Sequence, residues 1–162
     1  MRTRQPSAVL ETLRIPVQAK LAAAWTSFMF LYAYVDILGF YRPGHLEEIL
    51  GGSVHEFQTG PTFMSLALTA LAVPILMPLL STTLPARVNR TLNLVVATLY
   101  IPFSLYNVSG EQTWDYSSFF GLSIGLEVLL LAFILRSAWT WPRRTSPPAT
   151  LAPSADREAA RI

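Results

Sequence analysis

The chain has 162 residues, of which 52% are hydrophobic and 14% are charged, and its apolar residues fall in long runs separated by short polar ones. This composition is typical of a single-domain membrane protein rather than a soluble one. The net charge of +2 gives no reason to expect nucleic acid as a partner, and a chain without cysteine has no disulfide, no thiolate metal site and no dithiol redox centre.

The first long apolar run predicts a membrane-spanning helix over residues 21–41, after an N-terminal segment, residues 1–20, that we expect to be cytoplasmic. The run is too long for the apolar region of a signal peptide and has no small-x-small cleavage site, so we expect it to be retained. Trp25 and Tyr41 are expected to anchor its ends at the membrane interfaces. Asp36 lies inside the run, roughly 7 Å from its outer end at the helical rise.

A polar, acidic loop is expected over residues 42–61, where HLEEIL could form one or two amphipathic turns on the membrane surface. The second span is predicted over residues 62–80. It contains Pro74 and Pro78, which lie four residues apart and therefore on one face of the helix. We expect these prolines to kink the second span.

A short basic turn is predicted over residues 81–91, followed by the third span over residues 92–108. The polar residues of this span, with one alanine between them, recur at steps of three and four, which places them on one helical face. They are Asn93, Ala97, Tyr100, Ser104 and Asn107. We expect this face to point into the protein.

The fourth span is predicted over residues 117–136 and contains Glu127. A helix of this length rises about 30 Å, which matches the hydrocarbon core of a bilayer, so Glu127 is expected near the midplane. The last residues, 142–162, are rich in Pro, Ala, Ser and Arg, and we expect them to form a disordered cytoplasmic tail.

The distribution of Lys and Arg predicts the orientation. Four lie in residues 1–20, two in residues 81–91 and five from residue 136 onward, whereas Arg42 alone belongs to the other side. Basic residues collect on the cytoplasmic side of membrane proteins. The sequence therefore predicts an all-α fold, a four-span antiparallel transmembrane helical bundle over residues 21–141, with both termini cytoplasmic.

The carboxyl groups inside the spans give the functional hypothesis. An ionisable side chain in the membrane is costly unless it faces protein, is neutral or has a partner, and it commonly marks a functional site. We expect a polar pocket for a small ligand or proton, serving binding or transport, lined by Asp36, Tyr100, Ser104, Asn107 and Glu127. We also expect Glu127 to be neutral at pH 7.

Two alternatives to this pocket stay open. In the first, the protein is a structural or accessory membrane subunit whose carboxyl groups only clamp helices together, an interaction worth about 0.6–2 kcal/mol. In the second, it is a small membrane-embedded enzyme that uses Glu127 as acid or base. The sequence names no ligand, and we expect the lipid bilayer to be its surroundings.

The outer loop could in principle bind a metal through His45, Glu48, His55 and Glu56. Their spacing is not a known ligand motif, so we expect neither a metal site nor a cofactor. Gly121 and Gly125 form a small-x-x-x-small pattern, which allows close helix packing. We expect this packing to lie within the bundle, with a homo-oligomer as the alternative.

Four stretches of the chain carry a family resemblance, and together they cover about residues 18–143. These are KLAAAWTSFMFLYAYVDILGFYRPGHLEEI, LPARVNRTLN, YIPFSLYNVSGE and EVLLLAFILRSAWTWPR. They resemble a family of small bacterial four-helix membrane proteins known only as a domain of unknown function. The resemblance implies the fold and the bacterial inner membrane, but no reaction. The general layout is also similar to that of DoxX-like proteins, as an analogy of architecture.

Overall fold

The computed structural model describes residues 15–54, 57–109 and 116–142. The predicted disordered tail lies almost wholly outside these residues, as does most of the N-terminal segment. His55 and Glu56, two of the candidate metal ligands, also lie outside them.

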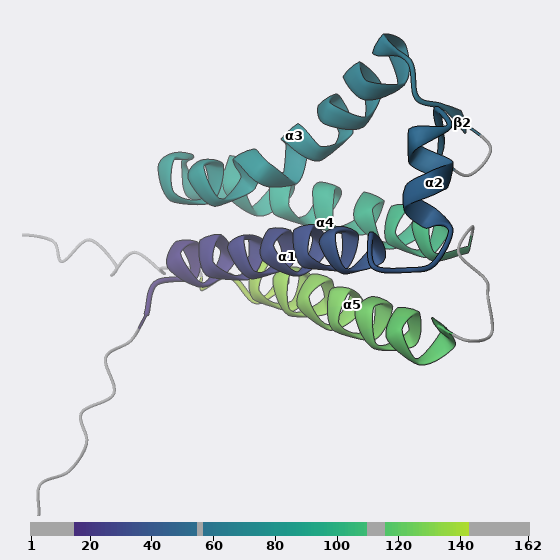
Figure 1. Ribbon diagram of the computed structural model, residues 1–162. Coiled ribbons are helices and arrows are strands. Elements are labelled where there is room, and N and C mark those ends of the chain that lie inside the picture. The colour runs from purple at the N-terminus through teal and green to yellow at the C-terminus, as the bar shows by residue number, and fades with distance from the viewer. Residues whose placement is uncertain (1–14, 55–56, 110–115, 143–162) are drawn as a thin grey trace, which may run out of the picture.

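Four long helices make up most of the described protein (Figure 1). They are α1 (Val17–Gly39), α3 (Pro61–Thr83), α4 (Ala86–Ser109) and α5 (Ser117–Trp139). Between α1 and α3 come α2 (His45–Leu50) and two paired strands, β1 (Ser53–Val54) and β2 (Phe57–Gln58). Helix α1 packs against α3 and α5, and α4 packs against α5 and α3. The predicted all-α class is therefore confirmed, and so is the expected helix at HLEEIL.

The long helices share two ends, which we name for what lies there. The terminal end holds the start of α1, the end of α5 and the connection from α3 to α4, and the α2 end holds α2 and the strands (Figure 1). The predicted turn over residues 81–91 proves to be almost entirely helical, because α3 continues to Thr83 and α4 begins at Ala86. Pro85 separates the two helices, and the basic residues beyond it are good helix formers.

Three of the described helices, α1, α3 and α5, are long and apolar enough to cross a membrane, each with 23 residues. The protein is therefore a membrane protein by the length and composition of its helices. Helix α4 is as long, with 24 residues, but its first turns carry Arg87, Asn89, Arg90 and Asn93.

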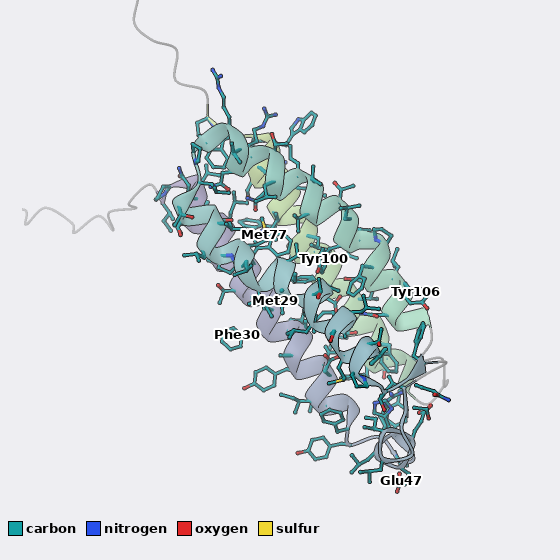
Figure 2. All side chains as sticks on the ribbon, turned by 90° about the horizontal axis from the view of Figure 1, so that it is seen from above. Met29, Phe30, Glu47, Met77, Tyr100 and Tyr106 are labelled. Atoms are coloured by element: carbon teal, nitrogen blue, oxygen red, sulfur yellow. The ribbon has the colours of Figure 1, made fainter. Side chains whose placement is uncertain are left out.

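The buried apolar side chains gather between the middle of the helices and the terminal end. They are Leu21, Ala24, Trp25, Phe28, Met77, Val96, Ala97, Tyr100, Leu131, Ile134 and Ala138. At the centre, Trp25 meets Phe28 and Tyr100 edge to face, with ring centroids 5.7 and 6.2 Å apart. Such aromatic pairs stabilise a core by more than the burial of their surface area alone would. Met77 and Tyr100 are labelled in Figure 2.

Trp25 is a core residue and not the interface anchor that its position in the sequence suggested. It is 0% exposed, and its Nε1 donates a hydrogen bond of 2.7 Å to Asn93 Oδ1. Asn93 Nδ2 in turn donates to Asn89 Oδ1 at 2.7 Å, and Asn89 Nδ2 donates to the Ser81 carbonyl oxygen. That carbonyl lies in the last turn of α3, where helical partners run out. This polar network thus joins α1, α3 and α4 at the terminal end.

Helix α3 bends near its middle, as its prolines predicted (Figure 1). Proline has no N–H, so Pro74 cannot donate to the carbonyl of Ala70 four residues earlier. The Tyr100 hydroxyl supplies the missing donor and bonds the Ala70 oxygen at 2.5 Å. A side chain of α4 therefore stabilises the bend of α3.

This arrangement predicts the result of a double-mutant cycle. Tyr100→Phe should lower the free energy of unfolding by about 1 kcal/mol, because the Ala70 carbonyl loses its donor. In a Pro74→Ala background the effect should fall close to zero, since the new backbone N–H at position 74 can bond that carbonyl. Thermal unfolding in detergent measures both, with exposed Tyr34→Phe as the control. Equal losses in the two backgrounds would contradict the assignment.

Candidate functional site

Glu127 lies at the middle of α5 and is only 4% exposed, so it faces the protein interior as predicted. Ser104 of α4, which is 0% exposed, lies beside it. The Ser104 hydroxyl is close enough to interact with the carboxyl group, but its oxygen has no hydrogen bond of good geometry with any described residue. A buried hydroxyl and a buried carboxyl thus meet at the centre of the helices with hydrogen-bonding capacity left over.

Tyr32 of α1 extends this pair toward the α2 end. Its hydroxyl oxygen accepts a hydrogen bond from Asn107 Nδ2 of α4. The same hydroxyl lies within electrostatic range of both Glu127 and Asp36. The sequence prediction did not include Tyr32 among the site residues. The signal that could have found it is the helical spacing that places Phe28, Tyr32 and Asp36 on one face of α1.

Asp36, which we predicted to line the pocket, is an exposed residue. It continues the inward face of α1, on which Trp25 and Phe28 are buried and Tyr32 is half-buried. Asp36 is nevertheless exposed, at the part of this face nearest the α2 end. It therefore lies at the rim of the polar cluster, within electrostatic range of Glu127.

Tyr100 belongs to the site less directly than predicted. Its ring packs among Trp25, Phe28 and Phe103, and its hydroxyl bonds the Ala70 carbonyl of α3. The structure thus brings together Ser104 and Glu127, joins Asn107 to them through Tyr32, and leaves the hydroxyl of Tyr100 occupied by another helix. We call Glu127, Ser104, Tyr32, Asn107 and Asp36 the carboxyl cluster.

A hollow of about 350 Å³ lies elsewhere, between α1 and α3. Its lining is mainly apolar and consists of Thr26, Met29, Phe30, Ala33, Ile75 and Pro78. None of these residues belongs to the carboxyl cluster. Figure 2 shows Phe30 pointing away from the helices, and 63% of its surface is exposed.

Of the four candidate metal ligands, only His45 and Glu48 lie among the described residues. His45 Nδ1 lies 3.2 Å from Arg42 Nη2 and 3.8 Å from Glu48 Oε2. The arginine can only donate to that nitrogen, which is therefore occupied. Within residues 15–54, 57–109 and 116–142, no three His, Asp or Glu side chains are grouped to hold a metal ion.

Gly121 and Gly125 are exposed on the outer surface of α5, so the expected close packing within the bundle is wrong. A Cβ atom added at either glycine would meet no atom within 4 Å. The inward face of α5 is instead set by Ser123, Glu127 and Leu131, which recur at steps of four.

Comparisons with known proteins place the chain in a family. No curated protein and no solved structure gave a match. The match found is to a family described as "Family of unknown function (DUF6326)", over residues 15–145, which include every helix of the structure. The predicted resemblance to a domain of unknown function is thereby confirmed, whereas similarity to DoxX-like proteins is not shown. The chain belongs to DUF6326, a family of unknown function.

Proposed function

We propose that the protein crosses a bacterial inner membrane four times, with α4 as the additional span and both termini in the cytoplasm. Helix α4 has 24 residues, packs along α5, and follows α3 after a connection of only two residues, Leu84 and Pro85. Such a short connection brings α4 back antiparallel to α3. The excess of Lys and Arg toward the terminal end supports a cytoplasmic location for that end.

Reporter fusions test this topology. A reporter that is active only in the cytoplasm should work when fused after Arg144 and fail when inserted within residues 45–58. A periplasmic reporter should show the reverse. A cytoplasmic 45–58 loop would refute the proposed orientation.

We further propose that Glu127 takes up and releases a proton as part of binding or moving a small ligand. The observation that supports this is a carboxyl group 4% exposed at the middle of an apolar helix, beside a hydroxyl whose oxygen has no hydrogen bond of good geometry with any described residue. A charged carboxylate at that depth is costly, so we expect the protonated form, which can exchange. A set of four spans is small for a transporter, so transport would favour a homo-oligomer.

A comparison of wild-type protein with Glu127→Gln tests this function. In weakly buffered nanodiscs, an alkaline jump should release about one more proton per wild-type chain than per variant chain, because glutamine has no proton to lose. Equal release would show that Glu127 does not titrate and would overturn the proposal.

The second candidate is a structural or accessory role, and one observation favours it. Hydrogen bonds from Trp25 to Asn93, from Asn89 to the Ser81 carbonyl and from Tyr100 to the Ala70 carbonyl each join two different helices. The 350 Å³ hollow is mainly apolar and separate from the carboxyl cluster. A protein with this role needs no exchangeable proton. Equal proton release together with a destabilised Glu127→Leu variant would support it.

A further inference from the structure

Burial along the inward faces of the four long helices differs between the two ends. Toward the terminal end these faces are closed, and Leu21, Met77, Ile134 and Ala138 are all 0% exposed. Toward the α2 end the same faces open: Asp36 on α1 is exposed. Ala67 and Ala70 on α3, Asn107 on α4 and Phe120 on α5 are half-buried, whereas Ser104 and Ser123, on the same side of Glu127, stay buried.

The course of α3 explains this difference. Beyond its bend, α3 runs away from α4 toward α2 (Figure 1). In this half, the face that α3 turns toward the other helices carries Phe63, Ala67 and Ala70, all half-buried. Met77 and Ser81, which are 0% exposed, lie toward the terminal end.

The inward residues next to Glu127 are polar on the side of the α2 end, whereas on the other side apolar residues separate it from the Asn89, Asn93 and Ser81 network. Toward the α2 end, Glu127 is followed by Ser104, then Tyr32 with its partner Asn107, and then Asp36 at the rim. Toward the terminal end, the next inward residues of α5 are Leu131 and Ile134, both 0% exposed. Water can hydrate the first set and has no polar partner among the second.

We propose that Glu127 is reached by water and protons from the α2 end alone, along a passage formed by Ser104, Tyr32 and Asp36. The proton transfer rests on the proposed function, whereas the one-sided access to water does not. The Tyr32 hydroxyl is the relay, with water completing the hydrogen bonds to both carboxyl groups: its oxygen accepts a proton that comes from the Asp36 carboxylic acid while its own proton passes to the Glu127 carboxylate. The transfer leaves Tyr32 neutral, Glu127 protonated and Asp36 ionised, so charge and protons balance.

Among the described residues, the titratable groups of α1 and α4 nearest this passage are Tyr32, Asp36 and Tyr100, and the Tyr100 hydroxyl is bonded to α3. At the α2 end, the Arg42 guanidinium lies 5.2 Å from the centroid of the Phe120 ring. Helix α3 has no titratable side chain anywhere in Pro61–Thr83. On α5, Arg136 is exposed and lies nine residues from Glu127, at the terminal end.

Cysteine accessibility tests the passage, because the natural chain has no cysteine to give a background. A small, membrane-impermeant methanethiosulfonate is applied to right-side-out or inverted vesicles, and unreacted thiols are counted afterwards. Glu47→Cys, at an exposed position of α2 labelled in Figure 2, reports which vesicles present the α2 end. Ser104→Cys should react from that side alone, although Ser104 is 0% exposed like Ala97, because the polar groups on its side of Glu127 admit water. Ala97→Cys and Ala138→Cys, at closed inward positions, should react from neither.

Reaction of Ser104→Cys from the terminal side, or from neither side, overturns the passage. Should that variant fail to fold, Asn107→Cys at the half-buried part of the passage replaces it, with the same expected result. These outcomes do not depend on whether Glu127 titrates. If the labelling is as expected but wild type and Glu127→Gln release equal amounts of proton, the passage is supported and the proposed function is contradicted.

The relay is tested by the rate at which the Glu127 carboxyl group exchanges its proton for deuterium, followed by infrared spectroscopy. Tyr32→Phe should slow this exchange at least about tenfold, a typical effect of losing a positioned proton-transfer group. Tyr34→Phe is the matched control, because Tyr34 lies on the same helix but is 60% exposed. Unchanged exchange in Tyr32→Phe, or equal slowing in both variants, would show that Tyr32 is not the relay.

Discussion

Replacing Trp25 with alanine is expected to lower the free energy of unfolding by about 3–5 kcal/mol, the usual cost of removing a large buried aromatic side chain. Trp25 is 0% exposed and contacts Phe28 and Tyr100 edge to face. The substitution also removes the donor to Asn93 Oδ1, which stays buried among α1, α3 and α4. Thermal or denaturant-induced unfolding in detergent measures the loss.

Trp139→Ala is the matched control, because the same change at a side chain that is 70% exposed should alter the free energy by no more than about 0.5 kcal/mol. Trp25→Phe separates the contributions: it keeps most of the packing and should lose about 1 kcal/mol through the missing hydrogen bond. Similar losses in Trp25→Ala and Trp139→Ala would mean that Trp25 does not lie in the core.

Glu127→Gln should abolish proton release at this site while the free energy of unfolding stays within about 1 kcal/mol of wild type. Glutamine retains the shape of the side chain and can still bond a neighbouring hydroxyl, but it has no exchangeable acid proton. Glu127→Leu removes both properties. Its free energy of unfolding should fall by up to about 2 kcal/mol, or stay unchanged where packing compensates.

Ser123→Ala is a suitable control for these variants. Ser123 lies on the same face of α5, is 3% exposed, and its hydroxyl bonds the Phe120 carbonyl within the helix. It should change neither proton release nor, by more than about 1 kcal/mol, stability. If Glu127→Gln were unstable but released as many protons as wild type, the proposed function would be contradicted, because the carboxyl group would then act only as a structural contact.

The sequence was most informative where one helical face carried an unambiguous pattern. The stripe on α4 from Asn93 through Ala97, Tyr100 and Ser104 is buried as predicted, because its spacing alone decides which residues share a face. The bend of α3 also followed from the sequence, since the chemistry of proline determines where helical hydrogen bonds are lost.

The misplaced residues depended on contacts between helices that spacing cannot supply. Trp25 was predicted to be an interface anchor, but its ring nitrogen donates a hydrogen bond to Asn93 of α4. Asp36 lies on the predicted face of α1 but is exposed, and its exposure depends on how the other helices approach, which spacing along α1 does not determine. Gly121 and Gly125 fit a packing motif that says nothing about which side of α5 faces the protein.

The most direct test of the central claim, that Glu127 is a buried, protonated and exchangeable carboxyl group, is the infrared C=O stretching band of a carboxylic acid in lipid nanodiscs at neutral pH. We predict a protonated-acid band that shifts in deuterium oxide and is missing from Glu127→Gln. A spectrum without that band in the wild-type protein, with carboxylate bands lost instead on substitution, would contradict the claim.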